Sequence, residues 1–204
     1  MVTKIKGKIM VEGDEDREHL GLVHVITGDG QGKTTSSLGI ALRALGSNLK
    51  VYMIQFLKSG TTGEVYTIKK HLPGMEIIQF SVDAINERQQ KIDQFRDKGS
   101  KFTFNPDEQE KEAAMLGFHH AKKIINSKDY DLVILDELNT ILDKDIIQVK
   151  DIIDLMENHG NVELVFTGRD APQEIIEKAD YVSMVKGIKH PWQKGIKARK
   201  GIEY

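Results

Sequence analysis

The residues best suited to chemistry stand in one stretch, positions 22–35, which reads LVHVITGDGQGKTT. An apolar run passes directly into a glycine-rich turn, and an alanine-rich helical pattern follows at 36–45. In such a strand–loop–helix unit, backbone N–H groups converge on phosphate oxygens, a lysine adds positive charge and a threonine hydroxyl ligates Mg²⁺. We therefore predict a nucleoside triphosphate site, formed by Thr27, Gly28, Asp29, Gly30, Gln31, Gly32, Lys33, Thr34 and Thr35.

This loop departs from the common phosphate-binding pattern at one position. In that pattern a further glycine stands five residues before the glycine that corresponds to Gly32. Here that position is Thr27. Glycines occur instead at positions 28, 30 and 32. The loop is therefore a variant.

A second motif suits the same ligand. The apolar run 130–135 reads YDLVIL and leads into Asp136 and Glu137. An acid at the end of a buried strand is the Walker B arrangement, which holds the Mg²⁺ of a nucleotide directly or through water. We predict that Thr34, Asp136 and Glu137 hold the metal.

Other polar residues follow apolar runs in the same way. Gln55, Lys58 and Glu64 come after the run 50–56, and Arg169 comes after the run 162–166. Ligands of open α/β sheets bind beyond the carboxyl ends of the strands, so a substrate could contact these side chains, although each alone is equally consistent with a solvated loop. The permanent charge of Arg169 suits it to clamp phosphate oxygens.

The elements that must position these residues alternate along the chain. Apolar runs at 50–56, 75–80, 130–135, 162–166 and 180–185 predict strands, and helical patterns begin at 36, 106, 145 and 173. This alternation predicts an α/β fold, with a mostly parallel central sheet and helices on both faces. We expect an N-terminal arm at 1–21, one domain at 22–204 and an insertion at 81–101.

Composition narrows the class of protein. The chain has 204 residues, a net charge of −2 and no cysteine, which argues against disulfides, thiolate metal sites and a cysteine nucleophile. No apolar run approaches membrane-spanning length. The near-neutral charge gives no general attraction to nucleic acid, although the tail 186–204 is basic. We expect a cytoplasmic protein that binds neither nucleic acid nor a membrane.

A set of motifs in fixed order resembles a known family. TGDGQGKTT is followed by VYMIQFLK, LVILDELN, FTGRDAP, ADYV, KHP and GIEY. Together they resemble the P-loop class of ATP:corrinoid adenosyltransferases, over about 23–204, and the resemblance implies a RecA-like P-loop NTPase fold. In that family a Co(I) corrinoid attacks the 5′ carbon of ATP and triphosphate leaves.

The resemblance also implies roles for individual residues. Lys33, Glu137 and Arg169 would be catalytic, with Mg²⁺ or Mn²⁺ at the phosphates. The other residues that it places at ATP or the corrinoid are Gln55, Glu64, Phe102, Phe104 and His190. The family pattern implies a homodimer and an electron-donor reductase. An aromatic pair there closes the lower face of the corrin, which removes an axial cobalt ligand and eases reduction to Co(I).

Three features differ from the family pattern. Gln31 stands where lysine is common, Phe104 stands where tryptophan is usual, and the segment 81–101 is longer than the family norm.

Two other functions also fit a P-loop. In a hydrolytic RecA-like ATPase, Glu137 would polarise water for attack on the γ-phosphate. A nucleotide-gated regulatory module would bind ATP without this chemistry. The reaction product, triphosphate or phosphate, and dependence on a corrinoid discriminate between the three.

Overall fold

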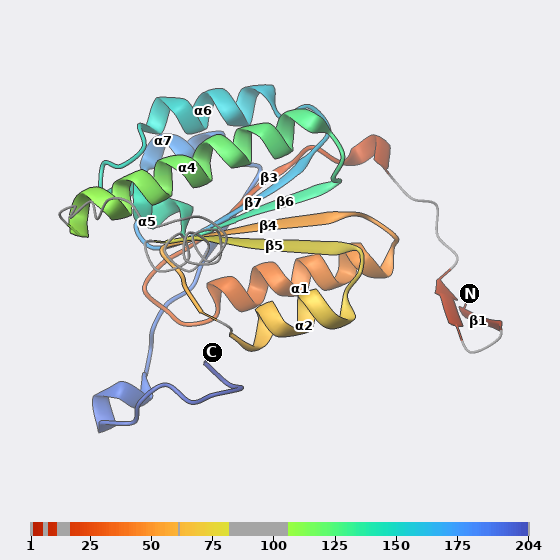
Figure 1. The fold of residues 1–204 in the computed structure, drawn as a ribbon, viewed down its shortest axis with the longest axis horizontal. Helices are drawn as coiled ribbons and strands as arrows, with labels where there is room; N and C mark the ends of the chain where they lie inside the picture. The colour runs from red at the N-terminus through yellow and green to blue at the C-terminus, as the bar shows by residue number, and fades with distance from the viewer. Residues whose placement is uncertain (1, 6–7, 12–16, 61, 82–105, 204) are drawn as a thin grey trace, which may run out of the picture.

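A six-stranded sheet forms the centre of the molecule (Figure 1). The computed structural model describes residues 2–5, 8–11, 17–60, 62–81 and 106–203. All pairings in this sheet are parallel, in the order β5-β4-β6-β7-β3-β8. The strands are β3 (Val23–Thr27), β4 (Val51–Phe56), β5 (Met75–Phe80), β6 (Leu132–Asp136), β7 (Glu163–Thr167) and β8 (Tyr181–Met184).

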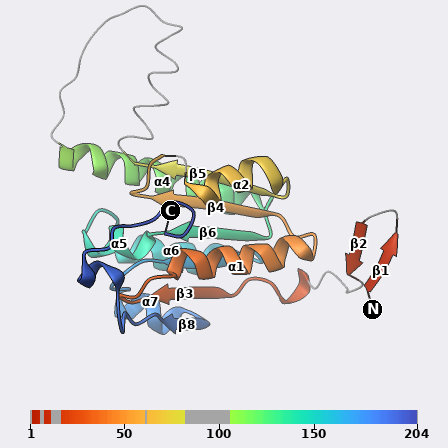
Figure 2. The ribbon, with the colours of Figure 1, turned by 90° about the horizontal axis from the view of Figure 1, so that it is seen from below.

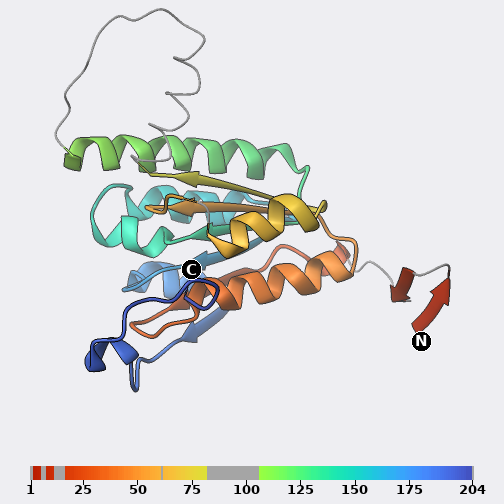
Figure 3. The same cartoon turned by 60° about the horizontal axis from the view of Figure 1, so that its bottom comes forward.

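Helices cover both faces of this sheet. α1 (Lys33–Gly46) and α2 (Gly63–His71) lie on one face, and α4 (Pro106–Ser127), α6 (Val149–Asn158) and α7 (Gln173–Lys178) lie on the other (Figures 1 and 3). Short α5 (Leu138–Asp143) directly follows β6. β4 and β6 are buried along their whole length, as expected for parallel strands that are covered on both faces. The predicted fold class is confirmed.

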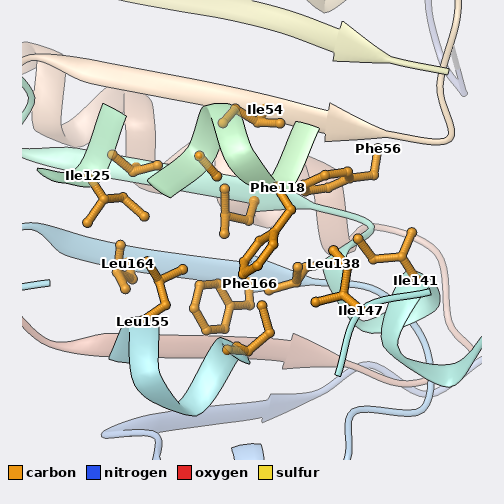
Figure 4. Packing of buried hydrophobic residues seen from close by; sticks show 14 of the residues in the cluster. Ile54, Phe56, Phe118, Ile125, Leu138, Ile141, Ile147, Leu155, Leu164 and Phe166 are labelled. Carbon is orange, nitrogen blue, oxygen red and sulfur yellow. The ribbon is translucent and has the colours of Figure 1, made fainter. Parts of the chain in front are cut away.

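Each face of the sheet has its own apolar core. On one side, Phe118 of α4, Ile141 of α5 and Leu155 of α6 belong to one cluster with Phe166 of β7 (Figure 4). On the other side, Ala41 of α1 and Ile68 of α2 belong to a second cluster. Burial of these side chains fixes the strand order and therefore the positions of the loops that follow the strands.

Some elements differ from the predictions. Neither α2 nor α5 was predicted, because both are short and weakly patterned. The helix predicted from 145 begins at Val149, since Asp145 has a φ of 53°, which breaks a right-handed helix. In the predicted arm, β1 (Val2–Ile5) and β2 (Lys8–Val11) pair antiparallel, and a 3₁₀ turn spans Arg17–His19.

The domain boundaries stay a prediction. The predicted insertion lies outside the described residues except for Ser81. Within the described part of the chain, no helix has the length and apolar character needed to cross a membrane.

The sheet brings distant motifs to one edge. β3, β7, β6 and β4 are neighbours, and their carboxyl ends point the same way. In the register of the strands, Gln55 pairs with Asp136, and Ile26 pairs with Thr167. The glycine-rich loop and the acidic motif therefore meet at the carboxyl edge of the sheet, as the sequence predicted.

Candidate active site

The glycine-rich loop is held by the segment after β8. Gly30 N–H donates to the Val185 carbonyl (2.8 Å), and Val185 N–H donates to the Thr27 carbonyl (2.8 Å). A Cβ atom on Gly28 would lie 2.4 Å from Val185 O, and one on Gly30 would lie 2.7 Å from the Lys186 carbonyl carbon. Glycine is therefore required at 28 and 30 because another backbone passes directly against the loop.

Lys33 begins α1 and lies within the loop. Its Nζ donates to the carbonyls of Gly28 (2.6 Å) and Gly30 (2.8 Å), and the residue is 9% exposed. Burial lowers the pKa of Lys33, and the negative charge of Glu137 opposes this shift. The ammonium group is thus largely buried and fixed against the loop carbonyls, in a residue at the N-terminus of α1, where the helix favours anions.

Asp136 is the centre of a buried polar network. Its residue exposure is 0%, and both carboxylate oxygens accept hydrogen bonds. Oδ1 accepts from the hydroxyls of Thr34 (2.9 Å) and Thr167 (2.6 Å). Oδ2 accepts from Gln55 Nε2 (3.0 Å) and Lys58 Nζ (2.7 Å). Asp136 therefore ties together residues of β4, β7 and α1 at the end of the sheet.

Glu137 is held beside this network in an unusual backbone conformation. Its φ is 65°, in the left-handed region, and its N–H donates to Thr167 Oγ1 (3.0 Å). The Thr140 hydroxyl donates to Glu137 Oε2 (2.7 Å). Strained backbone that is held by such bonds is concentrated at functional sites. The bonds fix the second acid at the wall of the cavity.

A cavity of about 720 Å³ opens over the loop and the start of α1. Figures 2 and 3 show the C-terminal segment returning to this end of α1, and its residues 201–203 line the cavity. Of the predicted site residues, those that line the cavity are Asp29, Gly30, Gln31, Gly32, Lys33, Thr34, Thr35, Glu64, Glu137, Arg169 and His190. The structure thus brings most of the predicted residues into one space.

Several predicted residues do not line this cavity. Asp136 and Gln55 are fully buried and contact each other, and Thr27 Oγ1 accepts a hydrogen bond from Ala171 N–H (3.1 Å). The Gly28 carbonyl accepts a hydrogen bond from Lys33 Nζ. These residues support those that line the cavity. Phe102 and Phe104 lie outside the described residues, so their role stays a prediction.

Sequence reasoning missed several contributors. Thr167 and Thr140 were not singled out, and Lys58 was named only as a strand-end residue that a substrate could contact, without its ion pair to Asp136. Thr167 immediately precedes the Gly168–Arg169 pair, so its place at the end of an apolar run was the available signal. No local pattern indicates that residues 201–203 return to the phosphate loop, because that depends on the path of the tail.

The oxygen atoms around Thr34 suit a hard cation. Thr34 Oγ1 and Asp136 Oδ2 already contact a positive group, the Lys58 ammonium, at 2.9 and 2.7 Å. Among the described residues there is no group of three or more His, Cys, Asp and Glu side chains that could hold a metal ion. Mg²⁺ commonly takes one or two carboxylates and completes its shell with water and phosphates, so this smaller donor set fits it.

This combination of fold and site defines a P-loop nucleotide-binding protein. The strand–loop–helix unit, the buried acid at the end of β6 and the cavity that Lys33 and Arg169 line lie at one edge of a parallel sheet. A family model described as ATP:corrinoid adenosyltransferase BtuR/CobO/CobP matches residues 19–204. The chain belongs to this family of ATP-dependent adenosyltransferases.

Individual relatives agree with this assignment. A corrinoid adenosyltransferase of Sinorhizobium sp is 31% identical over 97% of this chain and 85% of its own length. The Escherichia coli (strain K12) corrinoid adenosyltransferase is 29% identical over 98% of this chain and 94% of its own. Corrinoid adenosyltransferase CobA of Salmonella typhimurium is 30% identical with the same coverage, 98% and 94%. These matches favour adenosyl transfer over the hydrolytic alternative.

Proposed function

We propose that this chain transfers the 5′-deoxyadenosyl group of ATP to the Co(I) centre of a corrinoid and releases triphosphate, in the synthesis or salvage of adenosylcobalamin. The observation that carries the proposal is the cavity over the phosphate loop, with Lys33 and Arg169 in its wall, in a chain of this family. Such a cavity suits a triphosphate at one end and leaves room for the nucleoside.

The proposed reaction requires charge stabilisation more than proton transfer. The electron pair of Co(I) forms the cobalt–carbon bond, and the pair of the broken C5′–O5′ bond leaves on the triphosphate. No proton has to move, so the site needs no general base. The protein must orient ATP and stabilise the charge that develops on the leaving group. Lys33 and Arg169 line the cavity, which supports this role for them.

A divalent cation fits the same assignment. Thr34 and Glu137 would hold Mg²⁺ or Mn²⁺ at the cavity wall, and Asp136 would orient the Thr34 hydroxyl from behind. When bound, the ion neutralises phosphate charge. Gln31 supplies a neutral amide where the family commonly has lysine, so the cation and Arg169 carry more of the leaving-group charge in this chain.

The family resemblance extends the proposal to partners and to the corrin. We infer a cytoplasmic homodimer that receives electrons from a separate reductase. Phe102 and Phe104 would lie against the lower face of the corrin, and His190, Glu64 and Gln55 would serve the nucleotide or the corrinoid. His190 and Glu64 line the cavity, which supports this inference for those two residues.

The test is a reaction with ATP, Mg²⁺ and a chemically reduced Co(I) corrinoid. The expected result is the absorption spectrum of an alkylcobalt product together with stoichiometric triphosphate. Omission of the corrinoid should abolish ATP consumption. Steady release of phosphate from ATP without corrinoid would refute the proposal in favour of a hydrolytic ATPase.

A further inference from the structure

Lys58 lies at the boundary between the buried network and the cavity. Its Nζ is 2.7 Å from Asp136 Oδ2 and 2.9 Å from Thr34 Oγ1. Its side chain is 28% exposed, whereas that of Asp136 is fully buried, and Lys58 lines the cavity together with Lys33 and Arg169. The ammonium group therefore contacts the buried acid and has access to the space over the phosphate loop.

The backbone before Lys58 is held in a conformation that bulky residues rarely adopt. Leu57 has a φ of 56°, and its N–H donates to the Phe80 carbonyl at the end of the neighbouring strand (3.0 Å). This turn takes the chain out of β4 at the point from which Lys58 reaches Asp136. A strained turn that positions a polar group at a cavity is typical of a functional site.

The buried charge of Asp136 depends on this lysine. The other three groups that donate to its carboxylate, from Thr34, Gln55 and Thr167, are neutral. A fully buried carboxylate with only neutral partners is strongly destabilised, so the Lys58 ion pair compensates a charge that the fold cannot expose.

The position of Lys58 conflicts with a bound divalent cation. An ion at Thr34 Oγ1 would lie close to the Lys58 ammonium, since both would contact the same hydroxyl oxygen. Like charges at this separation repel each other. A triphosphate in the cavity would offer the displaced ammonium new anionic partners within the same space.

We propose that Lys58 is an exchangeable counter-ion. It pairs with Asp136 and Thr34 while the site is empty, and it moves to the triphosphate oxygens when the nucleotide and its cation bind. Lys58 is then a further phosphate-binding residue that stabilises the leaving triphosphate. This inference rests on the proposed function of the cavity.

The first measurement is the affinity for inorganic triphosphate in Mg²⁺, determined by isothermal titration calorimetry. Lys58→Met keeps the length of the side chain but removes its charge, and it should weaken triphosphate binding by about tenfold or more, as expected for loss of one charge-assisted contact. Lys58→Arg keeps the charge and should retain most of the affinity. Lys69→Met, on exposed α2 surface away from the cavity, is the matched control and should bind like wild type.

The second measurement is Mn²⁺ binding to the nucleotide-free protein, followed by the electron paramagnetic resonance signal of free Mn²⁺. Without the lysine, the Thr34 hydroxyl oxygen is open to a metal ion and no ammonium group repels it, so Lys58→Met should bind Mn²⁺ more tightly than wild type. Lys58→Met should thus weaken triphosphate binding and strengthen Mn²⁺ binding, whereas a damaged fold would weaken both. If Lys58→Met does not fold, Lys58→Gln keeps a donor beside Asp136 and is tested in the same way.

Each outcome is decisive. Unchanged triphosphate affinity in folded, uncharged Lys58 variants overturns the inference and leaves the proposed function intact. Weaker Mn²⁺ binding together with weaker triphosphate binding also overturns it, because this pattern indicates structural damage. If wild type itself fails to bind triphosphate, the proposed function is refuted and the inference with it.

Discussion

Thr167 is the residue through which the two acids of the site depend on each other. Its hydroxyl donates to Asp136 Oδ1 (2.6 Å) and accepts from Glu137 N–H (3.0 Å), and the residue is fully buried. Thr167→Val replaces the hydroxyl by a methyl group of similar size, so it removes both bonds without opening a cavity. We expect this variant to destabilise the nucleotide-free protein.

The magnitude follows from the two bonds. A hydrogen bond to a charged group contributes about 1.5–3 kcal/mol, and an unsatisfied buried N–H costs about 1–3 kcal/mol. The two contributions together predict a loss of about 2.5–6 kcal/mol in the free energy of unfolding. Thr167→Ser keeps the hydroxyl and removes one methyl group, which costs about 1 kcal/mol.

The assay is urea unfolding of the wild type and both variants, without nucleotide or metal, at neutral pH. The midpoint should fall much further for Thr167→Val than for Thr167→Ser, with the denaturant slope unchanged. Equal losses in the two variants would refute the reasoning, because they would show that the methyl group, and not the hydroxyl, is what the site requires.

Four further predictions concern separate features. Lys33→Ala should lower kcat/KM by a factor that corresponds to about 2–4 kcal/mol, because one preorganised charge-stabilising group is lost. An unchanged kcat would show that Lys33 does not stabilise the leaving-group charge. Glu137→Gln should shift the Mg²⁺ dependence of the reaction to higher concentrations, and full activity at an unchanged metal optimum would remove the carboxylate from the metal site. Burial raises the pKa of Glu163, but hydrogen bonds from His24 and two backbone N–H groups outweigh this effect and hold it below its ordinary value of 4.5. The stability that these bonds provide is fully present above pH 4.5 and is lost as the pH falls through the folded-state pKa of Glu163. The difference in Tm between wild type and Glu163→Gln should therefore be full at pH 7 and shrink below pH 4.5. A difference that stays constant with pH would contradict this role of Glu163. Phe104→Ala should strongly lower adenosylation that starts from Co(II) with a weak reductant but have much less effect with preformed Co(I), and equal losses with a lowered Tm would make Phe104 a core residue.

The nature of the site could be predicted from the sequence because its signals are local. The glycine spacing before Lys33 and the apolar run before Asp136 each lie within a few consecutive residues. Strands that are covered on both faces read as continuous apolar runs, so the run predicted at 50–56 became β4, which is buried along its whole length. Short elements with no clear period, such as α2 and α5, were missed because tertiary packing and not local pattern stabilises them.

The partners within the site were decided by the tertiary structure. Thr34 and Asp136 are 102 positions apart, and Lys58 and Asp136 are 78 apart, so no local pattern joins them. They meet because β4, β6, β7 and β3 are neighbours in the sheet, and the burial of two apolar cores sets that order. The same packing buries Asp136 completely and brings residues 201–203 to the cavity. A sequence specifies which groups are available for chemistry, but the strength of a charge or hydrogen bond depends on burial and distance, which only the folded chain determines.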